Sequence, residues 1–207
     1  MSWTAYLTYL TFAVVVVLVP GPDFAVVAGN TVSGGRTRGM WCAAGVASSN
    51  AVQGAAAIMG LGALVVRAQP VFHAVKWLGA AYLAYLGARL LWSAARGRYE
   101  APDPAAEPHA ARRGWRQGFL SNITNPKVLL FYVAVLPQFL GPDAGVLSLA
   151  LFALSHAVLS LIYLLSLTAA MHRARGWLTR GRVRRCLDAV TGTAMLGFGA
   201  RLAVAQR

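Results

Sequence analysis

Charged residues are scarce in this sequence, and acidic residues are the scarcest of them. Of its 207 residues, 12% are charged and 57% are hydrophobic, a composition that excludes an ordinary soluble domain. The sequence has 19 Lys and Arg against 6 Asp and Glu, which gives a formal net charge of +13. These basic residues gather in short segments between apolar runs. That distribution is typical of membrane topology signals and does not favour binding to nucleic acid.

Cysteine is nearly absent as well. Cys42 and Cys186 lie far apart and form no C-x-x-C pair, so the sequence signals neither a thiol-redox motif nor a zinc site. We interpret both as small apolar packing residues. The N-terminus lacks the basic region of a secretory signal peptide, so the first apolar segment is predicted to be a helix of the mature protein. We expect no cofactor, no bound metal and no enzymatic activity.

Long apolar segments are plentiful, and they predict an all-α integral membrane protein with six transmembrane helices. A span needs roughly 20 apolar residues. The expected segments run from about 4–34, 39–66, 71–92, 117–140, 144–172 and 186–204. A basic turn at 34–38 separates the first two. We predict one transporter domain over 1–207, with a first half at about 1–92, a flexible linker at 93–116 and a second half at about 117–207.

Proline interrupts the first and fourth of these segments. Pro20 and Pro22 flank Gly21 deep in the first one, and Pro126 lies in the fourth. Proline removes a backbone donor and clashes with the preceding turn, but it is favoured at a new helix start. Asp23 directly follows the first break, in a stretch with no other charge between residue 1 and Arg36. A carboxylate at membrane depth costs about 2.5–3.5 kcal/mol, so it normally faces a partner, a cavity or a transported ion.

The two breaks lie half a chain length apart and divide the sequence into two groups of three helices. An odd number of spans in each group means that the two halves point in opposite directions across the membrane. Paired interrupted helices in such inverted repeats indicate a transport site near the midplane. Basic residues are concentrated in the first, third and fifth connections, which the positive-inside rule assigns to the cytoplasm. Both termini are therefore expected on the extracytoplasmic side.

Asp23 and Lys127 follow the two breaks at equivalent positions. A helix that starts inside the membrane presents unpaired N–H groups and a partial positive charge. Asp23 is predicted to bind a substrate ammonium group or the coupling proton. Lys127 is predicted to bind the substrate carboxylate, or to pair with Asp23 when no substrate is bound. The alternative is that the two charges only neutralise each other and lock the halves together.

Five further side chains are candidates for the same site. Asn122 and Asn125 are expected to satisfy carbonyl groups freed by the break or to line the site. Asn50 and Gln53 lie in the middle of the second segment, where they either line a cavity or bond between helices. His156 either relays protons or bonds to a neighbouring group.

Three stretches resemble the LysE/RhtB family, the lysine exporter and homoserine/threonine exporter group of bacterial inner-membrane proteins. They are VPGPD at 19–23, KWLGAAYLAYLG at 76–87, and GFLSNITNPK at 118–127 followed by LPQF at 136–139. In this order and spacing they form a specific signature that covers most of the chain. Carried over residue by residue, the family motif indicates the functional positions Pro20, Gly21, Pro22, Asp23, Asn125, Pro126 and Lys127.

The resemblance implies export of amino acids or close derivatives from the cytoplasm, driven by the proton-motive force. We interpret the chain as a secondary active transporter of the bacterial inner membrane that works by alternating access. Its expected partners are an amino acid, membrane lipid and a coupling proton, and a homo-oligomer is left open. The motifs do not identify the amino acid. The alternatives are export of another small solute or a metal ion on the same scaffold, or a membrane thiol-redox enzyme.

Overall fold

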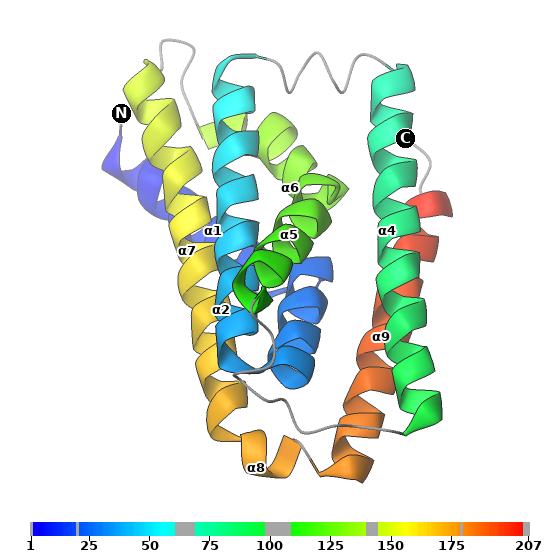
Figure 1. Ribbon diagram of the computed structural model, residues 1–207. Coiled ribbons are helices and arrows are strands. Elements are labelled where there is room, and N and C mark those ends of the chain that lie inside the picture. The colour runs from blue at the N-terminus through cyan, green and yellow to red at the C-terminus, as the bar shows by residue number, and fades with distance from the viewer. Residues whose placement is uncertain are drawn as a thin grey trace.

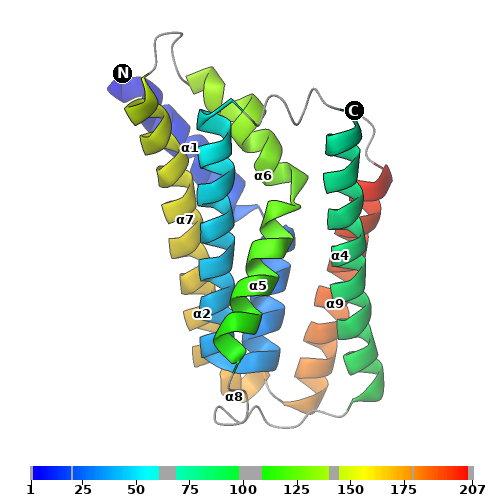
Figure 2. The ribbon, with the colours of Figure 1, turned by 45° about the horizontal axis from the view of Figure 1, so that its top comes forward.

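The computed structural model describes residues 2–19, 21–60, 69–97, 109–139, 145–178 and 180–204, and all regular structure in these ranges is helical (Figure 1). The chain order is α1 (Trp3–Leu18), α2 (Pro22–Ile58), α4 (Gln69–Arg96), α5 (Ala110–Ile123), α6 (Pro126–Leu130), the π-helical turn η1 (Phe131–Val135), the 3-10 turn η2 (Leu136–Phe139), α7 (Val146–Arg173), α8 (Arg175–Leu178) and α9 (Gly181–Val204). The long helices lie side by side, with the ends of the chain at the end opposite α8 (Figures 1 and 2).

Helices end and begin at the positions where proline predicted breaks. α1 ends at Leu18 and α2 begins at Pro22, with the two helices inclined by 52°. Gly21 between them has an extended backbone. α5 ends at Ile123 and α6 begins at Pro126. Proline is tolerated at a helix start because its missing N–H would have no intrahelical partner there. Pro20 lies outside the described residues.

The segment after the second break changes its winding twice. α6 has a single turn, after which the chain widens into η1 and then tightens into η2. Pro137 in η2 has no N–H to donate to a carbonyl one turn earlier, so a regular α-helix cannot continue through it. π-helical turns of this kind occur frequently at functional sites.

The structure differs from the predicted segments most clearly at two places, and α9 also begins at Gly181, earlier than the predicted residue 186. α2 runs through the expected turn at 34–38, where Gly35 has a φ of 75° and joins two helical stretches at a kink. Glycine takes this left-handed conformation without steric cost because it has no Cβ. At the predicted linker over 93–116, α4 continues to Arg96 and α5 begins at Ala110, so helix occupies both ends of that segment.

The helices form two packed groups. α2 packs closely against α5 and α7, whereas α4 packs mainly against α9, and this pair stands apart in both ribbon views (Figures 1 and 2). Glycine allows the close approaches. A Cβ added to Gly118 of α5 would clash with the backbone carbonyl of Cys42, and one added to Gly192 of α9 would lie 2.9 Å from the carbonyl of Gly87. Small residues bring helix backbones together in this way in lipid.

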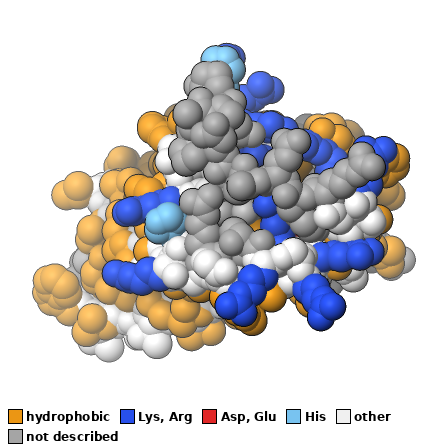
Figure 3. All heavy atoms as spheres, turned by 60° about the horizontal axis from the view of Figure 1, so that its bottom comes forward, with side chains coloured by type: hydrophobic (Ala, Val, Ile, Leu, Met, Phe, Trp, Pro, Cys, Tyr) orange, Lys and Arg blue, Asp and Glu red, His pale blue; other side chains and the backbone are white. Residues whose placement is uncertain are grey.

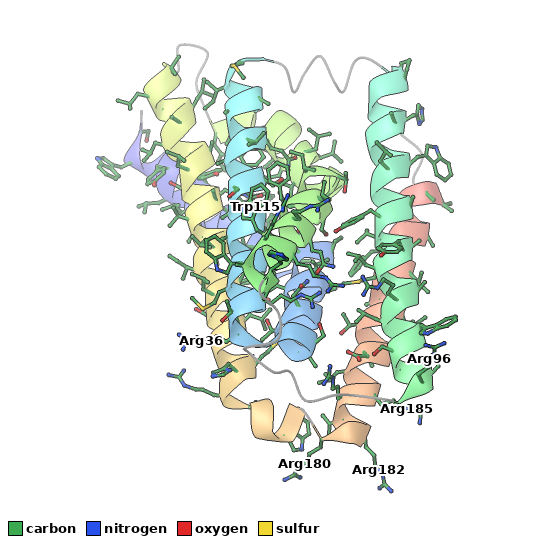
Figure 4. All side chains as sticks on the ribbon, viewed as in Figure 1. Arg36, Arg96, Trp115, Arg180, Arg182 and Arg185 are labelled. Atoms are coloured by element: carbon green, nitrogen blue, oxygen red, sulfur yellow. The ribbon has the colours of Figure 1, made fainter. Side chains whose placement is uncertain are left out.

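The outer surface is apolar along the helices and basic at one end. Among the described residues, α7 is long and apolar enough to cross a membrane, and the bent pair of α1 and α2 passes the same test together. Leu147, Leu154 and Ile162 project outward from α7. The end that carries α8 gathers Lys and Arg side chains, as Figures 3 and 4 show. The all-helical architecture agrees with the predicted class, while six spans and an inverted repeat stay predictions.

Candidate functional site

A cavity of about 30 Å³ lies where the two helix breaks meet. α1, α2, α6, η1 and α7 supply its walls. Six residues predicted for the site line this cavity: Gly21, Asp23, Asn50, Asn125, Lys127 and His156. The acid and the base that follow the two breaks thus line one cavity, and their role in binding stays a prediction. We call this space the upper cavity.

Asp23 lies in the first turn of α2, where the positive end of the helix dipole favours a carboxylate. Its Oδ2 accepts hydrogen bonds from the amide nitrogens of Asn122 at 3.0 Å and Asn125 at 3.3 Å. Its Oδ1 is buried and has no hydrogen-bond partner among the described residues. One carboxylate oxygen is thus held by the second break, and the other remains available to a ligand.

Lys127 lies in the first turn of α6, where its own helix dipole disfavours a cation. Its Nζ donates to the carbonyl oxygens of Val16 at 2.8 Å and Val19 at 3.1 Å. These carbonyls belong to the C-terminal end of α1, where intrahelical donors run out and a cation is favoured. Among the described residues, Lys127 therefore bonds to backbone carbonyls and not to Asp23. Asp23, the acid at the first break, is therefore held by asparagines near the second break. Lys127, the base at the second break, is held by carbonyl groups near the first break.

Asn125 joins these two contacts. Its side-chain oxygen accepts from the backbone N–H of Lys127 at 3.1 Å and so caps α6, while its amide nitrogen donates to Asp23. An asparagine at an N-cap satisfies one of the unpaired N–H groups at a helix start. A single side chain thus shapes the second break and holds the carboxylate of the first.

Asn50 and Gln53, for which cavity lining and bonding between helices were the two alternatives, have different surroundings. Gln53 donates to the backbone oxygen and side-chain oxygen of Asn122, at 3.1 and 3.0 Å, and so ties α2 to α5. Asn50 is 1% exposed and lines the upper cavity, but within the described part of the chain neither polar atom of its amide has a hydrogen-bond partner. An unsatisfied buried amide costs free energy, and binding of a polar ligand would recover it.

His156 of α7 lines the upper cavity and is also held by η1. Its Nδ1 lies 3.1 Å from the hydroxyl of Tyr132, and its ring stacks on Phe131 with a centroid separation of 4.2 Å. The π-helical turn supplies both neighbours. The expectation of a bond to a neighbouring group thus agrees with the geometry, and the position in the cavity wall keeps the proton-relay hypothesis open.

Several groups in this site were missed at the sequence level. The carbonyl oxygens of Val16 and Val19 and the side chains of Tyr132, Ser160 and Tyr163 were not predicted to take part. The positions of the prolines predict that carbonyl groups are freed at a break. They do not predict which cation binds those carbonyl groups, because the cation comes from the other half of the chain.

The alternative functions, a thiol-redox enzyme or a metal-ion exporter, would depend on cysteines or on a group of metal ligands. Cys42 is buried and Cys186 is exposed, and both are free thiols. Within the part of the chain that the structure describes, no group of three or more His, Cys, Asp and Glu side chains is arranged to hold a metal ion.

The sequence was compared with family models, with curated proteins and with solved structures. The family model of the LysE type translocator matches residues 14–206. The chain is 34% identical to the leucine efflux protein of Klebsiella pneumoniae over 204 residues, which is 97% of this chain and 95% of that protein. It is 32% identical to the leucine efflux protein of Salmonella typhimurium over 205 residues, with the same coverage. It is 30% identical to the uncharacterized membrane protein YrhP of Bacillus subtilis over 200 residues, 93% of this chain and 95% of that protein. No solved structure matches.

Proposed function

The chain belongs to the family of LysE type translocators, and on that premise we propose that it exports an aliphatic neutral amino acid such as leucine from the bacterial cytoplasm. The family is the one that the three motifs resemble, so the resemblance is confirmed. Membership makes the chain a bacterial membrane protein and a transporter rather than an enzyme. The substrate class is supported by two similar proteins that are named leucine efflux proteins.

The observation that carries this proposal is the pair of unpartnered polar groups in the upper cavity. The Oδ1 of Asp23 and the amide of Asn50 are buried there, beside the ammonium group of Lys127, and neither has a hydrogen-bond partner in the described ranges. An amino acid is a zwitterion that complements this wall. Its ammonium group binds Asp23, and its carboxylate binds Lys127 and the amide nitrogen of Asn50. Charge-assisted hydrogen bonds of this kind are the strong ones.

Transport by alternating access requires this cavity to change size. A space of about 30 Å³ holds a few water molecules and is too small for leucine. Loading must therefore separate groups that now touch, and the contacts of Lys127 with α1 are the ones that a substrate carboxylate would replace. Because α4 and α9 pack mainly against each other, that pair can shift relative to the other helices.

The distribution of charged residues supports a direction of transport and a coupling to protons. The arginine-rich end is assigned to the cytoplasm under the positive-inside rule, which puts both termini outside. Asp23 binds either a proton or the substrate ammonium group, so the two compete for one carboxylate. Such competition couples inward movement of a proton to outward movement of the amino acid.

The test is export of leucine from cells that are loaded with a leucine dipeptide and lack exporters of their own. Cells that produce the protein should release leucine faster than cells that lack it. An uncoupler that collapses the proton gradient should make the two release rates equal. Asp23→Asn should abolish export, because the neutral amide cannot bind the proton or the ammonium group. Val52→Ala is the matched control, since Val52 lies on the same helix and is 49% exposed.

Export by Asp23→Asn at the wild-type rate, with the protein shown to be folded and inserted, would refute the proposed site. Release of lysine, homoserine or threonine in place of leucine would keep the family function and refute the substrate.

A further inference from the structure

A second cavity lies farther along α2 and shares no lining residue with the upper cavity. It measures about 140 Å³, and residues of α2, α4, α5 and α9 line it. An α-helix rises about 1.5 Å per residue, so Asn30 in its wall stands about 10 Å from Asp23 along α2. Ser93 in the same wall is one turn from Arg96 at the arginine-rich end (Figure 4). We call this space the lower cavity.

The wall of the lower cavity carries buried charge of both signs. Arg38 is 8% exposed, and its guanidinium donates from Nε to the side-chain oxygen of Asn30 at 2.7 Å and from one Nη to that of Gln117 at 3.2 Å. Asp188 of α9 is 2% exposed and belongs to the same wall. Opposite charges in one wall complement a ligand that carries a carboxylate at one position and an ammonium group at another, because charge-assisted hydrogen bonds are the strong ones.

The remaining wall is apolar. Leu86 and Leu90 of α4 and Met195 of α9 line the lower cavity. Leu86, Met195 and Val26 also belong to a buried core cluster that includes Leu164, and Leu164 lines the upper cavity. This cluster, which we call the apolar layer, therefore contributes residues to the walls of both cavities.

We propose that the lower cavity is a loading site for a zwitterionic aliphatic amino acid on the cytoplasmic side of the apolar layer. The amino-acid carboxylate lies toward Arg38, its ammonium group toward Asp188, and its side chain against Leu86, Leu90 and Met195. The proposal rests on the proposed function for the direction of transport. Binding in the lower cavity does not itself require transport, so the two can be tested separately.

The binding test uses protection of a thiol in purified, detergent-solubilised protein. Ser93→Cys puts a thiol in the lower cavity wall, Cys186→Ser removes the exposed native thiol, and Cys42 is buried. Leucine should slow the reaction of this thiol with a maleimide several-fold. Leucinol lacks the carboxylate and 4-methylpentanoate lacks the ammonium group, so each should protect less. The matched control is Cys186 in otherwise unaltered protein, whose labelling leucine should not change.

Two variants test whether the protection by leucine comes from binding in the lower cavity or in the upper cavity. Asp188→Asn should remove the protection and raise the half-saturating cytoplasmic leucine concentration for export about tenfold, the equivalent of about 1.4 kcal/mol of binding, with little change in maximal rate. Asn50→Leu alters the upper cavity, so it should lower the maximal rate and leave the protection intact. If Asp188→Asn does not fold, Ser33→Leu narrows the lower cavity from α2 and should give the same result.

The outcomes separate the two proposals. Protection without leucine export supports the lower cavity and refutes the proposed function. Two results would overturn the loading site and leave the proposed function standing. One is leucine export without protection of the thiol. The other is a folded Asp188→Asn protein in which the protection and the half-saturating leucine concentration equal those of the wild type. Loss of protection in Asn50→Leu would also overturn it, because all binding would then belong to the upper cavity.

Discussion

The two helix breaks occupy equivalent places in the sequence, yet their helix starts are built differently. At the second break, the side chain of Asn125 caps α6 by accepting from the backbone of Lys127. At the first break, Gly21 precedes α2 and has no side chain to cap it. The second helix start is thus satisfied by its own residues. The first has no side-chain cap, and the carboxylate of Asp23 in its first turn accepts hydrogen bonds from Asn122 and Asn125 on one oxygen only.

The segments that follow the breaks differ as well. α2 runs on as helix to Ile58, whereas α6 passes into the π-helical turn η1 within one turn. That turn brings Phe131 and Tyr132 against His156. The comparison teaches that the second break makes more structural contacts than the first. On the proposed function, substitutions at the second break should reduce both stability and transport, whereas those around the first should reduce transport with little loss of stability.

Lys127→Met should have the largest effect, because it removes the two bonds to the carbonyls of Val16 and Val19. Hydrogen bonds to charged groups contribute about 1.5–3 kcal/mol each, so the free energy of unfolding in detergent should fall by about 3 kcal/mol, and export should stop. Lys127→Arg keeps the charge and donors and should retain most of the stability. Wild-type stability in Lys127→Met would break the assignment of a structural role to the second break.

Asn50→Leu should separate transport from stability. The substitution removes a buried amide without hydrogen-bond partners, so stability should stay unchanged or rise by about 1 kcal/mol. Leucine export should fall at least about tenfold, the rate equivalent of about 1.4 kcal/mol. Thermal unfolding and efflux are measured on the same preparations, with Val52→Ala as the control. Full export with reduced stability would mean that Asn50 serves packing.

Asn125→Ala should reduce stability moderately, because loss of an N-cap side chain costs about 1 kcal/mol. Asn125→Ser keeps a capping oxygen but loses the amide that donates to Asp23. The serine variant should therefore unfold near the wild-type temperature while its export rate falls. Equal stability loss in both variants would show that the bond to Asp23, and not the cap, carries the contribution of Asn125.

Gly21→Ala should have the smallest effect on stability. The backbone of Gly21 is extended, with φ −154°, and an added Cβ would lie 3.8 Å from Nζ of Lys127, an ordinary contact. Such a change should alter the free energy of unfolding by no more than about 0.5 kcal/mol. Because the methyl group enters the upper cavity wall, leucine export should still slow measurably. A large stability loss would show that the first break is as tightly built as the second.

Much of the fold was predictable because its signals are local. Proline at positions 22 and 126 marks a helix start by its own chemistry, and α2 and α6 begin there. Long apolar runs predicted the helices. The kink at Gly35 was predicted as a turn, because glycine and flanking arginines fit a connection as well as a bend within a continuous helix. The early start of α5 was missed, because its polar, Arg-rich first turns resemble a linker.

The sequence by itself determined where the helices break and that an acid follows one break and a base the other. These features depend on proline geometry and on the cost of charge in an apolar segment, both of which act locally. Tertiary structure alone decided that Lys127 binds backbone carbonyls at the end of α1, that Asp23 binds two asparagine amides, and that Asn50 finds no hydrogen-bond partner among the described residues. Those outcomes depend on how segments about a hundred residues apart align. That alignment is set by close helix packing, not by any single residue.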